Sequence, residues 1–265
     1  MLTSCSGDSG RIVGEMVGHL AALGGVEKVF ARGAVHRGGP HYRLKGTVGP
    51  VSIGEDECLV LGRAIEAFRP RHCFIIGNAF GFSSVLIAKM MEGCGGESVV
   101  TLDAKCEGDG ERCFGVAAEL GKRMGCGILT NKVGWSPRDI DAAAERAAYD
   151  LIFIDGLHRH PQVTEDYVGV KHLAHEESIL VWHDYWMLGI WQSVARAERD
   201  GFRCVKVNTS CEMVLGTRSE AVVGRIRGLY ENIEEPRRRL RPVAFLRACQ
   251  AMASGAARRY LGGSG

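Results

Sequence analysis

The chain of 265 residues lacks most features that mark membrane, secreted or nucleic-acid-binding proteins. No apolar run approaches the roughly 18 residues that a membrane-spanning helix needs, and the polar stretch Met1–Gly10 has no apolar core typical of a secretory signal. The ten cysteines form no CxxC pair, which predicts free thiols in a reducing, cytoplasmic setting. A net charge of +2 gives no general attraction to nucleic acids or membranes, so we expect neither as a partner.

A glycine turn stands between a buried strand and a packed helix. Cys73–Ile76 is an unbroken apolar run, typical of a strand buried on both faces, and Ser83–Met91 has apolar residues at helical spacing. The sequence GNAFG, residues Gly77–Gly81, joins them. Such a turn brings backbone N–H groups and the positive end of a helix toward a ligand. The stretch is therefore a candidate binding loop, although similar turns also serve packing alone.

Strands and helices alternate over most of the chain, which predicts an α/β fold with a doubly wound, mostly parallel, seven-stranded sheet. The expected strands span residues 72–77, 98–103, 127–131, 149–155, 178–184, 202–207 and 212–216, the last two forming an antiparallel pair. The expected helices span residues 12–23, 55–68, 82–92, 111–124, 137–148, 163–173 and 189–200, with a capping box at Ser52–Glu55.

The pattern divides the chain into three parts. Residues 1–51 form an N-terminal lid, 52–217 the ligand-binding domain, and 218–265 a basic helical extension rich in arginine, including Arg237–Arg239. The extension is interpreted as a solvated amphipathic appendage or as a subunit contact, and the second of these would give a homodimer. The alternative is a docking surface for an anionic partner.

Acidic residues end two of the predicted strands. Asp103 follows Gly77 by one βα unit, and a carboxylate at that place can accept hydrogen bonds from the ribose of an adenosine-containing cofactor. Dinucleotides and S-adenosylmethionine (SAM) both contain such a ribose. A dinucleotide fold requires G-x-G-x-x-G, and here only Gly77 and Gly81 are present, at a different spacing, which disfavours a bound pyrophosphate.

Four motifs in order resemble those of class I SAM-dependent methyltransferases that act on small-molecule hydroxyl groups. They are FIIGNAFGFSS at 74–84, VTLD at 100–103, DLIFIDGLH at 150–158 and ILVWHD at 179–184. The resemblance covers about residues 52–216 and is closest to the group that includes macrocin and catechol-type O-methyltransferases and cephalosporin-hydroxylase-like proteins. It implies that SAM is bound by Gly77, Asn78, Ala79, Gly81, Phe82, Ser83, Asp103, Trp135, Ser136 and Asp155.

The same resemblance implies a reaction centre at the ends of the fourth and fifth strands. In its metal-dependent branch, a divalent cation would be bound by Asp155, His183 and Asp184. An oxygen-rich site suits Mg²⁺, whereas an imidazole among the ligands favours Mn²⁺, Fe²⁺ or Zn²⁺. In a metal-free version, Asp155 stays in the catalytic set, and His158 or His183 removes the proton of the acceptor hydroxyl as a general base.

Two positions depart from the family pattern. Ile75 stands where an acid usually helps to bind the amino group of the cofactor, which leaves this group to Asp155 or to backbone carbonyls. Trp135 replaces a small residue near the adenine and is expected either to stack on the purine or to belong to the core.

Basic and aromatic residues flank the predicted acceptor site. The loop after Asp155 is rich in histidine, and His36, Arg37 and His41 of the lid could cover it, although a plain surface role is the alternative. Three tryptophans cluster around the fifth predicted strand: Trp182, Trp186 and Trp191. They are interpreted as core residues or, alternatively, as a flat platform for the acceptor.

The prediction is an enzyme, a SAM-dependent methyltransferase acting on a hydroxyl group of a small molecule, with O-methylation favoured over N-methylation and specialised metabolism as the expected setting. The alternatives are a dinucleotide-dependent oxidoreductase and a non-catalytic SAM-binding module.

Overall fold

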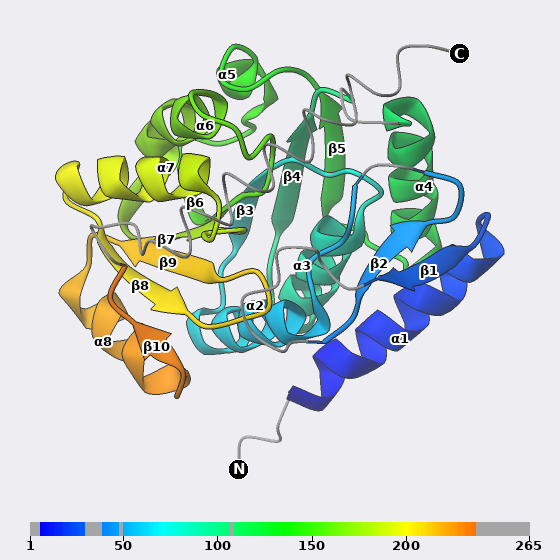
Figure 1. Ribbon diagram of the computed structural model, residues 1–265, viewed down its shortest axis with the longest axis horizontal. Helices are drawn as coiled ribbons and strands as arrows, with labels where there is room; N and C mark the ends of the chain where they lie inside the picture. The colour runs from blue at the N-terminus through cyan, green and yellow to red at the C-terminus, as the bar shows by residue number, and fades with distance from the viewer. Residues whose placement is uncertain (1–5, 30–38, 48–49, 106–108, 237–265) are drawn as a thin grey trace, which may run out of the picture.

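The computed structural model describes residues 6–29, 39–47, 50–105 and 109–236. Its main sheet contains β3 (His72–Ile76), β4 (Ser98–Asp103), β5 (Leu129–Val133), β6 (Tyr149–Ile154), β7 (Ala174–Trp182), β8 (Arg203–Val207), β9 (Met213–Thr217) and β10 (Ile233–Glu234). These form an eight-stranded sheet in the order β10-β8-β9-β7-β6-β3-β4-β5 (Figure 1). Strands β3 to β7 pair in parallel, and β9 pairs antiparallel with both β7 and β8. The predicted doubly wound fold is confirmed, and the short β10 is added to the seven predicted strands.

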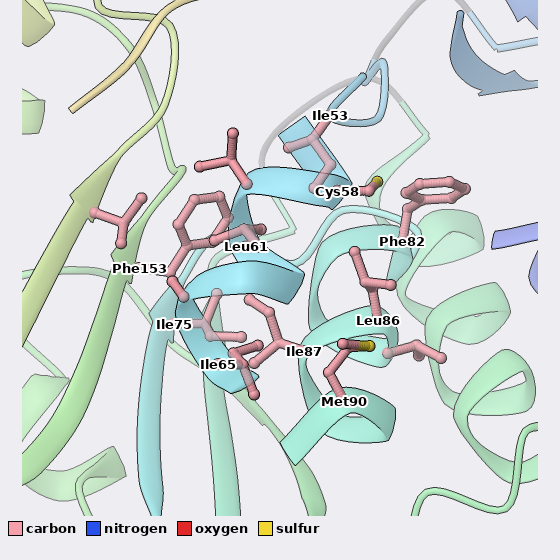
Figure 2. Packing of buried hydrophobic residues seen from close by; sticks show 14 of the residues in the cluster. Ile53, Cys58, Leu61, Ile65, Ile75, Phe82, Leu86, Ile87, Met90 and Phe153 are labelled. Carbon is pink, nitrogen blue, oxygen red and sulfur yellow. The ribbon is translucent and has the colours of Figure 1, made fainter. Parts of the chain in front are cut away.

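Helices cover both faces of the sheet. One face carries α2 (Glu55–Phe68), α3 (Phe82–Gly93), α4 (Gly110–Arg123) and α8 (Glu220–Leu229), and the other carries α5 (Ile140–Ala143), α6 (Gln162–Val170) followed by the 3₁₀ turn η1 (Lys171–Leu173), and α7 (Leu188–Arg199) (Figure 1). Cys73 and Ile75 of β3 pack toward the first group, while Phe74 and Ile76 pack toward the second. A strand buried on both faces explains the unbroken apolar run. Figure 2 shows Leu61 and Ile65 of α2 packed between α3 and the sheet.

The N-terminal part differs from the prediction. Helix α1 (Ser6–Ala22) ends before the paired glycines, as expected, but β1 (Val26–Val29) and β2 (His41–Leu44) then pair as an antiparallel two-stranded sheet within the segment predicted as a lid, where no strand was expected. Strands of four residues are too short to show an alternating pattern in the sequence. The lid residues His36 and Arg37 and the arginine-rich segment from Arg237 onward lie outside the described residues.

Helix starts and ends were the least accurate predictions. Gly54, rather than Ser52, precedes the first turn of α2, and its N–H donates to the carboxylate of Glu57 at 2.8 Å. The helix predicted at 137–148 is reduced to α5, because the N–H of Glu145 donates to the Tyr149 hydroxyl at 2.9 Å instead of to a helical carbonyl. Strand β5 begins two residues later than expected, because the N–H of Gly127 donates to the side chain of Glu92.

Among the described helices, none combines the length and the apolar character that crossing a bilayer requires.

Candidate functional site

The turn between β3 and α3 has room for glycine only. Gly77 has a φ of +87°, and a Cβ atom there would lie 2.2 Å from the carbonyl oxygen of Asp155. Gly81, which precedes α3, has a φ of +84°, and its Cβ would lie 2.8 Å from Cα of Ala117 on α4. Both positions combine a left-handed backbone with a close backbone neighbour. The turn therefore brings the carboxyl ends of β3 and β6 into direct contact.

Asp103, at the tip of β4, binds the glycine turn itself. Its Oδ2 accepts hydrogen bonds from the N–H groups of Asn78 at 2.7 Å and Ala79 at 2.9 Å, and its Oδ1 accepts one from Lys105 N–H at 2.6 Å. The sequence predicted that amides of this turn would face a ligand, but these two are already bound by the carboxylate. A carboxylate has about four acceptor positions, so Asp103 retains about one for a hydroxyl group.

A cavity of about 260 Å³ lies at the carboxyl ends of β3, β4 and β6. Its walls include most of the residues predicted to bind the cofactor: Gly77, Asn78, Ala79, Asp103, Trp135, Ser136 and Asp155. The rest of the predicted set, Gly81, Phe82 and Ser83, does not line this cavity. Phe82 and Ser83 instead line an adjoining pocket of about 30 Å³, which shares Gly77, Asn78, Ala79 and Asp155 with the cavity. Phe82 is buried and stacks on Tyr42, with ring centroids 5.3 Å apart.

One end of the cavity is formed by Trp135 and by two residues of α6. Trp135 is 38% exposed and so is not a core residue. The side-chain amide of Gln162 donates to the Ser136 carbonyl at 2.6 Å and to Asp166 Oδ1 at 2.8 Å. Burial raises the pKa of Asp166 to about 6, although hydrogen bonds from Ser136 and Gln162 oppose the shift. The sequence analysis missed Gln162 and Asp166, for which the i, i+4 spacing on a predicted helix was the only signal.

Around Asp155 in the same cavity, carboxylates and imidazoles alternate. His158 contacts Asp155 Oδ1 through Nε2 at 3.2 Å and Asp184 Oδ2 through Nδ1 at 3.1 Å. His183 contacts the same two oxygens through Nδ1, at 3.1 Å and 3.5 Å, and Oε2 of Glu57 through Nε2 at 2.9 Å. The fold thus brings together all the residues predicted for the reaction centre, and it adds Glu57 from α2, which the sequence analysis missed.

These contacts shift the pKa values of the cluster. Burial alone would raise the pKa of Asp155, but the charge of His183 and hydrogen bonds from His158 and His183 hold it well below its usual range. Burial alone would lower the pKa of both imidazoles; Asp184 and Asp155 instead raise the pKa of His158, and Glu57, Asp184 and Asp155 raise that of His183 well above its usual value. Both imidazoles therefore favour the charged form between these carboxylates.

The same geometry suits a divalent cation. Nδ1 of His183 lies 3.1 Å from Oδ1 of Asp155 and 3.5 Å from Oδ2 of Asp184. Ligand atoms of Asp155, His158 and His183 lie within 4.8 Å of one another, and so do those of His183, Asp184 and Cys211. Asp155, His158 and Asp184 line the cavity, whereas His183 is only 4% exposed and lies behind them. These two groups share His183 and together contain every residue of the predicted set, so the cluster fits a divalent cation, with His158 and Cys211 as additional candidate ligands.

The tryptophans near β7 have separate environments. Trp182 is fully buried, and its indole N–H donates to Ser193 at 3.0 Å, so it is a core residue. Trp186 donates to Asp184 Oδ1 at 2.8 Å and so restrains a residue whose φ is +58°. Trp191 is partly buried and packs against the core on the α6–α7 face.

Comparison with known proteins agrees with this geometry. Residues 74–185 match the family described as "Methyltransferase domain", a range that contains the glycine turn, Asp103 and the charged cluster up to Asp184. None of the curated proteins compared matches the sequence.

Solved structures show the same fold at low identity. An O-methyltransferase from Bacillus cereus in complex with SAH, the demethylated form of SAM, is 16% identical, with a TM-score of 0.54 over 78% of this chain and 90% of that chain. The O-methyltransferase TomG from Streptomyces achromogenes, in complex with SAM, is 16% identical, with a TM-score of 0.51 over 63% and 81%. A methyltransferase from Podospora anserina bound to SAH is 12% identical, with a TM-score of 0.52 over 64% and 80%. Residues 74–185 therefore form a methyltransferase domain, and the chain has the class I methyltransferase fold.

Proposed function

We propose that this protein transfers the methyl group of SAM to a hydroxyl group of a small molecule. The observation that carries the proposal is the cavity whose lining combines the glycine turn and Asp103 with Asp155, His158 and Asp184. The family match covers both ends of this cavity and favours a methyltransferase over a dinucleotide-dependent oxidoreductase.

The walls of the cavity suggest how the cofactor lies. The adenine fits beside Trp135 and Ser136, where an exposed indole offers a stacking surface. One ribose hydroxyl donates to the remaining acceptor position of Asp103. The sulfonium then lies near Gly77 and Asp155, because both residues line the cavity and Asp155 belongs to the charged cluster. With Ile75 fully buried in the sheet, Asp155 and backbone carbonyls are left to bind the amino group.

The charged cluster acts on the acceptor. When bound, SAM supplies an electrophilic methyl group, and a divalent cation held by Asp155, His183 and Asp184 would lower the pKa of the acceptor hydroxyl. The cluster then orients that hydroxyl in line with the methyl group, which is the main source of rate in such a displacement. In the metal-free alternative the neutral form of His158 takes the proton, although its contacts with Asp155 and Asp184 favour the charged form. His158 lines the cavity, whereas His183 is enclosed by Glu57 and Asp155.

The experiment measures cofactor binding and transfer separately. We expect SAH to bind the purified protein in calorimetry and NADH not to bind, and radiolabelled methyl transfer to some members of a panel of small-molecule alcohols and phenols. Asp184→Ala should abolish transfer while leaving SAH affinity within about threefold, a factor worth less than 1 kcal/mol. Asp141→Ala, whose side chain is 84% exposed and pairs with His172, serves as the control. Full transfer by the Asp184 variant would place the reaction elsewhere, and SAH binding without any transfer would support a non-catalytic module.

A cytoplasmic setting, a homodimer and the division into a lid, a central domain and a basic extension remain predictions of the sequence.

A further inference from the structure

Glu57 is a fully buried carboxylate in the first turn of α2. Its Oε1 accepts hydrogen bonds from the Thr209 hydroxyl at 2.9 Å and the Cys211 N–H at 3.1 Å. Its Oε2 accepts from the Gly54 N–H at 2.8 Å and lies 2.9 Å from Nε2 of His183. A buried anion is costly unless its acceptor positions are filled, and here all of about four positions are used. Nothing in the cofactor cavity requires this residue, because Glu57 does not line it.

The contact with Glu57 decides which nitrogen of His183 faces the reaction centre. An ionised carboxylate only accepts hydrogen bonds, so the nitrogen opposite Glu57 carries a hydrogen. Nδ1 is the nitrogen directed at Asp155 and Asp184, at 3.1 Å and 3.5 Å, and it too carries a hydrogen unless a cation takes the place of that proton. A metal-binding imidazole characteristically donates its other N–H to a carboxylate in this way, which fixes the ring and strengthens the ligand.

We propose that Glu57 is a positioning residue: it holds the ring of His183 so that Nδ1 points between Asp155 and Asp184, where a divalent cation binds. The inference rests on the metal-dependent form of the proposed function. It assigns to α2 a role in the reaction centre, although Glu57 and His183 are 126 residues apart in the chain.

The test replaces Glu57 by glutamine and measures the binding of Mn²⁺ alone by calorimetry. The glutamine amide has one oxygen and one N–H₂ group. In one orientation the N–H₂ group faces the donors Gly54 N–H and His183, and in the other it faces the Cys211 N–H, so either orientation places two donors against each other. We expect the dissociation constant for Mn²⁺ to rise about 10- to 100-fold, as for other carboxylates that orient a metal-binding histidine. The visible absorption spectrum of bound Co²⁺ should change as well, because the His183 ligand is displaced.

Asp56 provides a matched control on the same helix. Its carboxylate accepts hydrogen bonds from Ser210 N–H at 2.6 Å and Ser210 Oγ at 2.8 Å, so it also ties α2 to the β8–β9 loop but is not in contact with His183. Asp56→Asn should leave Mn²⁺ affinity and the Co²⁺ spectrum unchanged. Glu57→Asp keeps the charge but withdraws the carboxylate by one methylene, so it should also weaken Mn²⁺ binding. It replaces Glu57→Gln in the test if the glutamine variant does not fold.

The outcomes separate this inference from the proposed function. Unchanged Mn²⁺ affinity in the Glu57 variants, or an equal loss in Asp56→Asn, would overturn the positioning role. A wild-type protein that binds SAH but neither Mn²⁺ nor Co²⁺ would also overturn it, while leaving SAM-dependent transfer intact. Failure of the wild type to bind SAH would refute the proposed function, and the metal data would still decide the role of Glu57.

Discussion

Substitution of Gly77 by alanine tests the contact on which the cofactor site is built. The new Cβ would lie 2.2 Å from the carbonyl oxygen of Asp155, a backbone atom that cannot rotate away. A left-handed conformation costs a non-glycine residue about 1–2 kcal/mol. Forcing an extra methyl into a packed site costs about 1–3 kcal/mol more. We therefore expect Gly77→Ala to lower the free energy of unfolding by about 2–5 kcal/mol.

Gly95 separates the two contributions. Its φ of +85° matches the +87° of Gly77, but a Cβ there would have no neighbour within 4 Å. Gly95→Ala should therefore show the conformational cost alone, about 1–2 kcal/mol. Urea denaturation of the wild type and both variants gives the comparison, provided that the m-value is unchanged.

Cofactor affinity supplies the second measurement. Because relief of the clash must move Gly77 away from Asp155, we expect SAH affinity to fall at least tenfold in Gly77→Ala, or about 1.4 kcal/mol. Gly95→Ala should bind SAH like the wild type, since it lies outside the cavity. If Gly77→Ala is no less stable than Gly95→Ala and binds SAH normally, the proposed placement of the cofactor is wrong.

Three further variants test the walls of the cavity. Asp103→Asn should weaken SAH binding about tenfold or more, because an amide cannot accept every hydrogen bond given by Asn78, Ala79 and the ribose, and unchanged calorimetry would contradict this. Trp135→Ala should reduce SAH affinity by about 1–3 kcal/mol through lost stacking, with Trp135→Phe near wild type; equal values for both would argue against stacking. The pKa of Asp166 is raised in the folded state from 3.8 to about 6, so its contribution to stability is greatest below pH 4 and is lost as the pH rises to about 6. Asp166→Asn should remove this pH-dependent loss in the free energy of unfolding, which is about 3 kcal/mol. Urea denaturation of both proteins across this pH range measures it, and equal pH dependence of the unfolding free energy in the two proteins would refute the prediction.

The sequence predicted well what depends on local pattern. The apolar run of β3 and the glycine turn after it located the turn that lines the cavity, since burial on both faces and a left-handed backbone leave direct traces in residue type. The identity of Asp103 indicated a ribose contact, but its bonds to the turn amides could not be foreseen, because they depend on how closely β3 and β4 approach.

Helix boundaries were less predictable. The helix expected after Pro137 was shortened by a hydrogen bond from Glu145 to the Tyr149 hydroxyl, a contact that no propensity contains. Gly54 begins α2 in place of Ser52, because the Ser52 hydroxyl accepts a hydrogen bond from Tyr42 N–H at 2.8 Å. In the first case a side chain competes with the helix for a backbone N–H, and in the second a backbone N–H from another segment occupies the capping hydroxyl.

The sequence alone determined the order of strands and helices, the position of the turn, and the polar residues at the strand tips, because hydrophobic period and glycine placement encode these locally. Only the tertiary structure decided which partners those residues meet. Glu57 reaches His183 across 126 residues, and Gln162 and Asp166 enter the cavity from α6 because the sheet twist and helix packing place them there. Hydrogen bonds between distant segments carry no periodic signal in the chain, so the environment of each catalytic candidate followed from the fold.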